Sequence, residues 1–313
     1  MSSSRPETEE NLLSADSGNR RERKKTALQK LTFRPLTTED LPWLRRCRDA
    51  EAHPFTALNA VSLITWAETY GLSVGGDEDF FVIRSRYDEG YYAPAGDPDK
   101  CEAFIEKTAG EEKPARFLYL TETEARRLAL KGWKAHFRAD LSEYIASSSS
   151  LAMAPGSFIS ESYRRKCRKF AKAFGRYRVT PVTAENMDRL RATADRYREA
   201  RRSLPADQAV LETELEHYGD LNMKGILLTM PDGREAFILG YENIPGMFTM
   251  TMTRHDPTLP PEITTVCIHE FAALLQQKYP LINVEEDMGL EGLHQAKLLL
   301  SPVDFLKVYE VIR

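Results

Sequence analysis

Apolar residues in the first half of the chain recur at helical spacing in some segments and at strand spacing in others. In residues 56–71 they fall on one helical face, and a glycine follows where a helix end is expected: Leu58, Val61, Trp66, Tyr70 and Gly71. Residues 79–96 instead indicate two strands around the turn Asp88-Glu89-Gly90. The full pattern predicts a strand at 31–36, helices at 37–51 and 56–70, those two strands, a helix at 98–109, a strand at 116–120, a helix at 121–132 and a short strand at 133–137.

The stretch "ASSSSLAMAPGS", residues 146–157, interrupts this pattern because it has few bulky side chains and contains Pro155 and Gly156. We interpret it as a connection between two domains. The second half then repeats a similar order, with helices at 158–175, 185–202 and 207–218, strands at 224–230, 235–242 and 247–254, a long helix at 261–279, a strand at 281–285, a short helix at 289–299 and a strand at 304–312.

This order resembles that of the GNAT acyltransferase fold, and it occurs twice. The sequence therefore predicts an α/β (α+β) fold with two tandem GNAT-like domains. The expected bounds are 31–150 and 151–313, with the active site in the second domain, after a disordered polar tail at 1–30. The tail contains the basic run "RRERKK", for which a solvated linker is favoured over a phosphate-binding arm.

Composition narrows the class of protein. The chain has 313 residues, of which 42% are hydrophobic and 29% charged, which is typical of a globular protein. It has neither a stretch of about 18 apolar residues nor the apolar core of a signal peptide, so we expect a cytoplasmic protein without a transmembrane segment. The net charge of -4 argues against a nucleic-acid binder over the whole surface.

No metal or cofactor is expected. The cysteines, Cys47, Cys101, Cys167 and Cys267, form no C-x-x-C pair, which argues against a zinc knuckle and a disulfide framework. His269-Glu270 resembles the start of a zinc-protease motif, but Ala273 stands where the second histidine is needed.

A basic amphipathic segment, "SYRRKCRKFAKAFGRYR", begins at residue 162. On a helix its cationic side chains point away from the apolar face. These cations are Arg164, Arg165, Arg168, Lys169 and Lys172. They could bind a phosphate-bearing partner, either tRNA or a lipid head group, with peripheral contact to an anionic membrane as one form of this. A solvated helix face is the alternative, and the pattern alone slightly favours it.

The segment between the third strand of the second half and its long helix is "TRHDPTLPPEITT". Acyl-CoA enzymes of the GNAT type carry a glycine-rich loop here, whose backbone N–H groups bind pyrophosphate. This segment has no glycine and three prolines, so a coenzyme A cradle is not visible. His255, beside Arg254, lies where a donor could bind, although an ordinary loop histidine is the alternative.

Three carboxylates, Glu285, Glu286 and Asp287, follow a predicted core strand within "INVEEDMGLEGLHQAK". The carboxyl ends of strands in α/β folds commonly carry sites. A carboxylate there can bind an ammonium group or deprotonate an attacking amine or hydroxyl. The alternative is a charged strand end before a turn, and spacing alone does not decide between them.

The same stretch resembles the closing motif of the phosphatidylglycerol lysyltransferase C-terminal domain family, roughly N-R-E-x-D-x-G-x-x-G-L-R-x-A-K. The agreeing positions are Asn283, Glu285, Asp287, Gly289, Gly292, Leu293, Ala296 and Lys297. "SYRRKCRKF" is similar to the family's K-R-N-x-x-x-x-F segment, with Arg164 and Phe170 in register. "RPLTTEDLPWL", "DFFVIRSRYDEG" and "YYAPAG" also follow its pattern, so the resemblance spans nearly all of residues 31–313.

Some positions depart from the family pattern. Val284 and His294 stand where the closing motif has arginine, and Leu300 replaces an aromatic residue. After the third strand of the second half, the usual His and Glu-Lys are replaced by Thr251, Thr253 and Arg254. The fold that the resemblance implies is unaffected, whereas the transferred amino acid and the acceptor stay open.

The resemblance implies an aminoacyl-tRNA-dependent transferase that moves an amino acid to a lipid head group or another small acceptor. Glu285 and Asp287 would hold the donor's ammonium group or act as base, ahead of Glu286. Arg164 and Lys297 would meet phosphate or developing negative charge, and Arg254 with His255 would line the donor pocket. The further candidates for binding substrate are Arg168, Thr251, Asn283 and His294.

Two other functions stay open from the sequence. An acyl-CoA-dependent N-acyltransferase could use the same fold and would be expected to bind coenzyme A. A degenerate, non-catalytic GNAT-like binding protein is the second, because the motif arginines are missing at positions 284 and 294.

Overall fold

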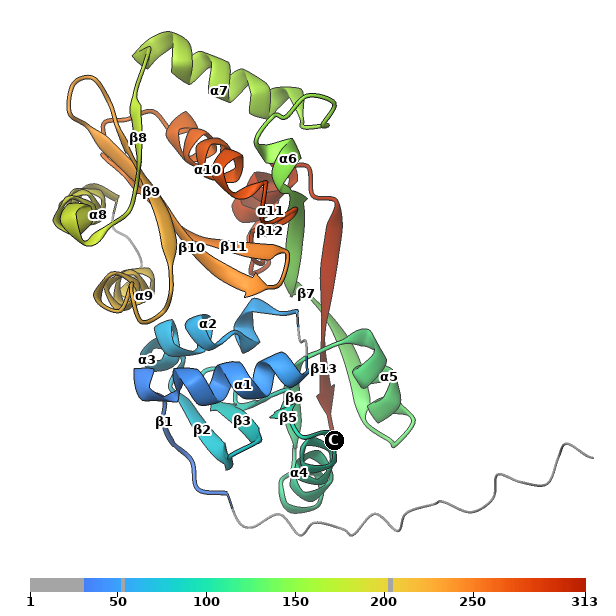
Figure 1. Ribbon diagram of the computed structural model, residues 1–313. Helices are drawn as coiled ribbons and strands as arrows, with labels where there is room; N and C mark the ends of the chain where they lie inside the picture. The colour runs from blue at the N-terminus through green and yellow to red at the C-terminus, as the bar shows by residue number, and fades with distance from the viewer. Residues whose placement is uncertain (1–30, 52–53, 202–204) are drawn as a thin grey trace, which may run out of the picture.

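The computed structural model describes residues 31–51, 54–201 and 205–313, and the predicted tail at 1–30 lies outside them (Figure 1). Over this part of the chain, the strands form one mixed sheet in the order β1-β2-β3-β4-β6-β13-β7-β12-β11-β10-β9-β8, with β5 paired to β3. The sheet therefore passes without interruption from the N-terminal half of the chain to the C-terminal half.

The N-terminal half supplies one end of the sheet and the helices around it. Its elements are β1 (Arg34–Pro35), η1 (Thr38–Asp40), α1 (Leu41–Glu51), η2 (Thr56–Leu58), α2 (Ala60–Thr65), α3 (Ala67–Tyr70), β2 (Leu72–Asp77), β3 (Phe80–Ser85), β4 (Gly90–Tyr92), β5 (Ala95–Gly96), α4 (Pro98–Glu111), β6 (Arg116–Leu120) and α5 (Glu122–Ala129). Gly71 ends α3 in the left-handed conformation, with φ of 57°, as the sequence predicts.

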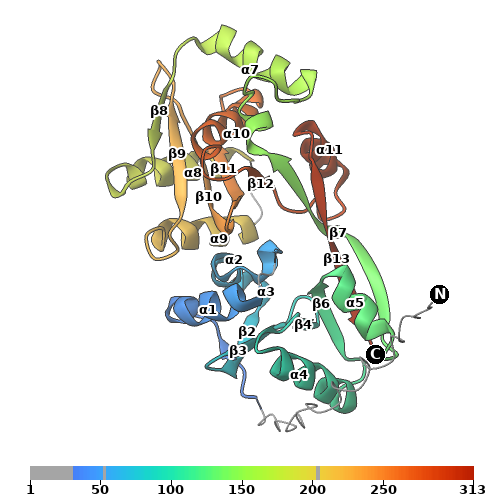
Figure 2. The same cartoon turned by 45° about the vertical axis from the view of Figure 1, so that its right-hand side comes forward.

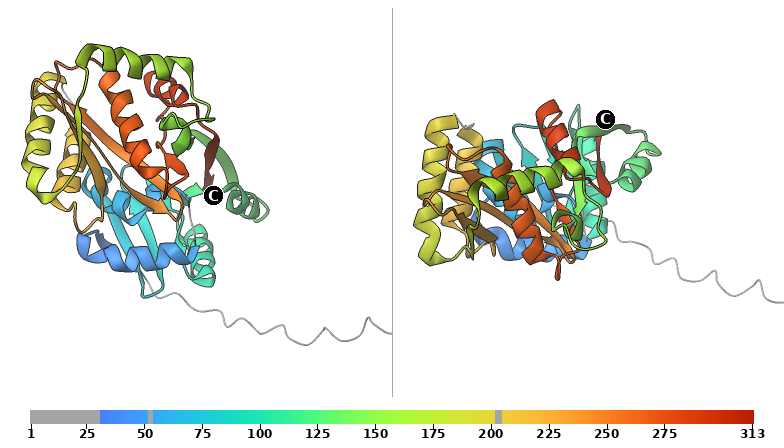
Figure 3. Two further views of the ribbon diagram at one scale, coloured as in Figure 1. Left: turned by 45° about the horizontal axis from the view of Figure 1, so that its top comes forward. Right: turned by 90° about the horizontal axis from the view of Figure 1, so that it is seen from above.

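The C-terminal half supplies the other end of the sheet. Its elements are α6 (Ser148–Leu151), α7 (Glu161–Phe174), β8 (Arg178–Pro181), η3 (Ala184–Asn186), α8 (Met187–Arg201), α9 (Pro205–Glu216), β9 (Lys224–Thr229), β10 (Glu235–Ile244), β11 (Met247–His255), α10 (Glu262–Leu275), β12 (Leu281–Asn283) and α11 (Glu291–Leu299). Helices α7 and α10 cover one face of this part of the sheet and α8 and α9 cover the other, and α7 lies across α10 (Figures 1 and 3).

Two long strands join the halves. β7 (Lys134–Ser147) pairs with β12 at its C-terminal end, and β13 (Asp304–Ile312), the last strand of the chain, pairs with both β7 and β6 (Figure 2). The C-terminal strand thus completes the sheet of the N-terminal half. The expected domain boundary at residue 150 stays a prediction, because the strands themselves run across it.

Alternating side chains of β9 and β10 enter two different cores. Leu227 and Phe237 belong to a core that extends over α8 and α9 into the N-terminal half, whereas Ile226 and Ile238 pack with α7 and α10. This is the two-residue period of a strand buried on both faces.

Most predicted elements are present, but their lengths and a few strands differ. β7 has 14 residues, whereas a short strand at 133–137 was expected, and β2 and β8 were not expected at all. The stretch at 146–157 contains the end of β7 and helix α6, in which Ser148, Ser150 and Leu151 are buried.

Candidate active site

The carboxylates of the closing motif follow directly from β12, at the point where its pairing with β11 ends. β12 is parallel to β11 with Asn283 opposite Thr249, and antiparallel to β7 with Asn283 opposite Ile145. Beyond Asn283, β11 continues to His255 while the chain turns away from it. The sheet therefore opens at Glu285, as the GNAT-like topology leads one to expect.

Asn283 and Glu143 fix this turn from inside the protein. The Asn283 Oδ1 accepts a hydrogen bond from the backbone N–H of Glu285 at 2.8 Å, and its Nδ2 donates to Glu143 Oε2 at 2.5 Å. The other Glu143 oxygen accepts from the N–H and hydroxyl of Thr56 at 2.8 and 2.7 Å. Burial, followed by the charge of Glu286, raises the pKa of Glu143 to about 7. Glu143 thus ties the N-terminal half to the strand end.

Asp287 is held by a second set of hydrogen bonds. Its Oδ2 accepts from the Tyr144 hydroxyl at 2.6 Å and lies 2.9 Å from His294 Nδ1, and its Oδ1 accepts from the N–H of Gly289 at 2.9 Å. Burial opposes ionisation of Asp287, but these hydrogen bonds outweigh it and lower its pKa. The side chain is buried, so it orders the turn into α11 and has little room for a ligand.

Lys297 completes the contacts between α11 and the strand end. Its ammonium group donates to the carbonyl of Val284. The Lys297 charge also favours the ionised forms of Glu285 and Glu286.

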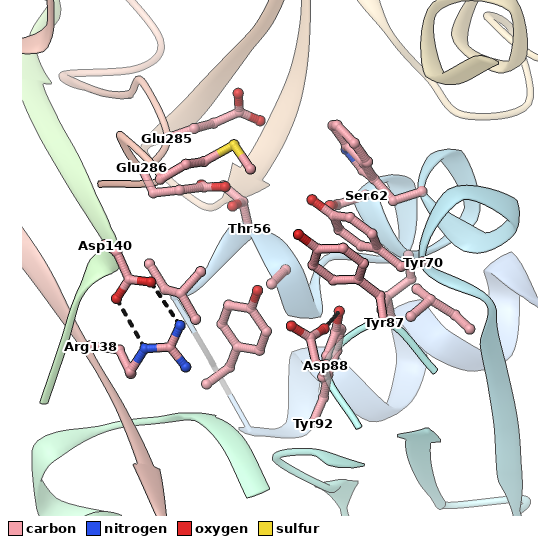
Figure 4. A pocket seen from close by; sticks show the side chains of 17 residues that line it. Thr56, Ser62, Tyr70, Tyr87, Asp88, Tyr92, Arg138, Asp140, Glu285 and Glu286 are labelled. Carbon is pink, nitrogen blue, oxygen red and sulfur yellow. Dashed lines mark hydrogen bonds and ion pairs between the residues drawn. The ribbon is translucent and has the colours of Figure 1, made fainter. Parts of the chain in front are cut away.

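Glu285 and Glu286 face a pocket between the two halves of the protein (Figure 4). Its volume is about 180 Å³, more than ten times the roughly 15 Å³ that a single water molecule needs. Besides the two glutamates, it is lined by Thr56, Ala57, Ser62, Leu63, Trp66, Tyr70, Leu72, Tyr87, Asp88, Tyr92, Tyr119, Arg138, Asp140, Leu141 and Met288. Asp287 is not among the lining residues.

Both glutamates have raised pKa values. For Glu285 the main cause is burial, followed by the nearby charge of Glu286, while for Glu286 burial dominates and Lys297 works against it. Two neighbouring carboxyl groups in a confined site cannot both ionise at the ordinary pKa, so at least one retains its proton to higher pH. A carboxyl group with a raised pKa that faces a pocket is a candidate for exchanging a proton with a bound substrate.

Three residues around the pocket have left-handed backbone conformations that side chains rarely adopt. The φ angles are 59° at Tyr119, 62° at Glu285 and 52° at Met288. Such conformations cost about 1–3 kcal/mol each and persist where the surrounding structure enforces them, often at functional sites. Here they direct a ring and a carboxylate into the same cavity.

The other residues predicted for the site lie elsewhere. Arg164 and Arg168 are on α7, where Arg164 donates to the carbonyl of Ser157 and Arg168 pairs with Glu161. Arg254 and His255 lie at the far end of β11, and both pack against Tyr197 of α8. Their roles in binding substrate stay predictions, since none of them lines the pocket.

Thr251 lies near a buried acidic residue that the sequence reasoning missed. Glu214 of α9 is 1% exposed, and burial raises its pKa to about 8. An interaction with the Thr251 hydroxyl works against this rise in pKa, and within the described residues the hydroxyl of Thr249 has no hydrogen-bond partner. Its position among Val210, Leu211 and Leu215 on one buried helical face is the sequence signal that could have revealed it.

The sequence pattern also gave no indication that aromatic and acidic residues of the N-terminal half line this pocket. Trp66 and Tyr70 were assigned to a helical core face, and Asp88 to a turn. Their convergence on Glu285 depends on the packing of the two halves, for which the local sequence carries no signal.

The segment before α10 has few N–H groups to offer a ligand. Those of Asp256, Thr258 and Leu259 donate to acceptors of the protein, and its three prolines have none.

The described residues also bear on metal binding and on membrane insertion. In these ranges, no group of three or more His, Cys, Asp or Glu side chains could hold a metal ion. None of the helices in the described ranges is long and apolar enough to cross a membrane.

The fold is of the GNAT-like α/β class, and an acidic pocket lies at the end of one of its central strands. Residues 56–312 match the family described as phosphatidylglycerol lysyltransferase, C-terminal, and the chain belongs to this family. Among curated proteins, none matches the chain.

Solved structures show the same fold. A conserved protein of unknown function from Bacteroides thetaiotaomicron is 22% identical with a TM-score of 0.79, over 90% of this chain and 99% of that chain. L-PGS from Bacillus licheniformis is 15% identical with a TM-score of 0.60, over 91% of this chain and 94% of that chain. The predicted family and the GNAT-like α/β fold class are therefore confirmed, and at family level the protein is a transferase.

Proposed function

We propose that the protein is an aminoacyltransferase that moves an amino acid from an aminoacyl-tRNA ester to an acceptor held in the pocket. The observation that carries this proposal is the pair Glu285 and Glu286, which face one cavity with raised pKa values. Attack on an ester requires removal of a proton from the nucleophile, and a carboxyl group with a pKa nearer neutrality does this more effectively.

Glu285 is the better placed base. Its backbone is held by Asn283 Oδ1, and its carbonyl accepts from the N–H of Tyr144 at 3.2 Å. We assign proton transfer to Glu285 with Glu286 beside it, and a positioning role to Asp287, whose oxygens are already engaged. Lys297 would stabilise the ionised glutamates, and His294 would hold Asp287.

The tRNA part of the donor would be bound outside this pocket. Exposed cations on α7, among them Arg165 and Lys172, offer a surface for the phosphates of tRNA. The same surface would serve peripheral contact with an anionic membrane if the acceptor were a lipid. The segment before α10 favours an aminoacyl ester over acyl-CoA, because its N–H groups are engaged within the protein.

Transfer from a pool of charged tRNAs tests this function. The full-length protein is incubated with charged total tRNA and with lipid, peptide or small-molecule acceptors, and the acceptors are analysed by mass spectrometry. One acceptor should gain the mass of an aminoacyl residue. Calorimetric binding of coenzyme A without any such gain would instead indicate an acyl-CoA enzyme, and the absence of both would indicate a binding protein.

A further inference from the structure

Two walls of the pocket are built from aromatic rings. Trp66 and Tyr70 are stacked with ring centroids 5.0 Å apart, and Tyr87 continues the stack at 5.0 Å from Tyr70. Tyr92 and Tyr119 form an edge-to-face pair at 4.7 Å. All of these rings come from the N-terminal half and line the pocket, and Tyr70 and Tyr87 stand across it from the glutamates (Figure 4).

The charged side chains around the same space are mostly acidic. Asp88, Asp140, Glu285 and Glu286 line it, and in the described part of the chain Arg138 is the one cation among the lining residues. Asp88 accepts hydrogen bonds from Ser85 and Tyr92 on the side facing the rings.

Arg138 is not available to an anionic ligand. Its guanidinium makes two hydrogen bonds to Asp140, at 3.0 and 2.7 Å, and a third to Glu310 at 3.0 Å. Two carboxylates therefore already compensate its charge. Lys297 does not line the pocket and donates to the carbonyl of Val284.

Aromatic faces together with carboxylates are the surroundings that bind organic cations. The face of an aromatic ring attracts an ammonium group, with a contribution of about 0.5–2 kcal/mol per contact. A phosphate in the same place would lie beside Asp88 and the two glutamates, and among the described lining residues it would find no unpaired cation, which is unfavourable.

We propose that this pocket binds the acceptor of the reaction as a small primary ammonium ion, and that it does not bind an anionic phospholipid head group. This inference rests on the proposed aminoacyl transfer and names the class of acceptor. The hydroxyls of Thr56 and Ser62, which also line the pocket, can accept hydrogen bonds from an ammonium group.

The reaction with such an acceptor balances without another reagent. The ammonium ion first loses one proton to Glu285 or Glu286. Its nitrogen then attacks the ester carbonyl carbon, the C–N bond of an amide forms, and the C–O bond to the tRNA ribose breaks. The nitrogen loses a second proton, which the ribose oxygen receives. The net products are the amide, deacylated tRNA and one proton released to solvent.

Calorimetry without tRNA separates this inference from the proposed function. The full-length protein is titrated with 1,5-diaminopentane, with lysinamide as a mimic of the aminoacyl group, and with glycerol 3-phosphate as a mimic of the lipid head group. We expect the diamine to bind and glycerol 3-phosphate not to bind. Binding of glycerol 3-phosphate, or of lysinamide without the diamine, would overturn the assignment.

Substitutions then localise the binding. Tyr87 is 67% exposed, so Tyr87→Ala should fold and should weaken diamine binding at least fivefold, while Phe158→Ala, at an exposed ring outside the pocket, should not change it. Equal binding by Tyr87→Ala, Asp88→Asn and wild type would show that the diamine binds elsewhere.

Transfer to a phospholipid but not to the amine would overturn the inference and keep the proposed function. Amine binding without any transfer would support the cation site and reject the function.

Discussion

Glu285 and Asp287 are two residues apart but have different surroundings, so they should respond differently to substitution. Glu285 lines the pocket, whereas Asp287 accepts hydrogen bonds from Tyr144 and Gly289. Glu285→Gln should lower the rate of aminoacyl transfer at least tenfold, and Glu285→Gln with Glu286→Gln should lower it ~100-fold or more, the lower bound for a lost general base. Glu185→Gln, at an exposed position of η3, is the control. Unchanged transfer in the double variant would exclude both glutamates as the base.

Asp287→Asn should act chiefly on stability. Hydrogen bonds to a charged group contribute about 1.5–3 kcal/mol, so the free energy of unfolding in urea should fall by about this amount at pH 7. Because the folded-state pKa of Asp287 is lowered, its ionised form stabilises the fold above the pKa of the unfolded chain, near 3.9. The difference between wild type and variant should therefore shrink as the pH falls through the folded-state pKa. A difference independent of pH between 2 and 7 would contradict this.

At the scale of the element, α7 should contribute to donor binding through charge alone. Tyr163 and Phe170 of α7 are buried and hold the helix against the core, so substitution of its exposed cations should leave the helix in place. Arg165→Glu with Lys172→Glu should weaken tRNA binding severalfold and reduce its dependence on salt concentration. Fluorescence anisotropy with labelled tRNA measures both. Affinity and salt dependence equal to those of wild type would exclude α7 from the tRNA surface.

Element-level prediction succeeded where one face of a segment is buried and failed where the signal is not local. The helix end at Gly71 and the turn at Asp88-Glu89-Gly90 follow from spacing and turn chemistry, whereas the one helix expected at 56–70 is divided into η2, α2 and α3. β7 was expected to be short because most of its N-terminal residues are exposed and lack a buried apolar face, and its length is set by pairing with β13. The motif carboxylates could be located from the sequence. The aromatic rings that line the same pocket could not, because these rings come from the other half of the chain.

At the scale of the whole molecule, the shared sheet and core should make the two halves unfold together. β13 pairs with β6 and β7, and one core extends from the N-terminal half to α8 and α9. The tryptophans, Trp43, Trp66 and Trp133, all lie in the N-terminal half, so their fluorescence reports on that half. Fluorescence and far-ultraviolet circular dichroism should give coincident urea transitions. Separate transitions would instead support independent domains divided near residue 150.

Aminoacyl transfer should take place at the pocket lined by Glu285 and Glu286, and a single-turnover experiment can follow it there. Excess protein is mixed with tRNA carrying a radiolabelled amino acid and with 1,5-diaminopentane, and the label is followed from tRNA to product. Wild type should move the label to the amine faster than the ester hydrolyses, and the variant with Glu285→Gln and Glu286→Gln should not. Label that leaves tRNA only at the rate of spontaneous hydrolysis, or equally fast with both proteins, would contradict the account.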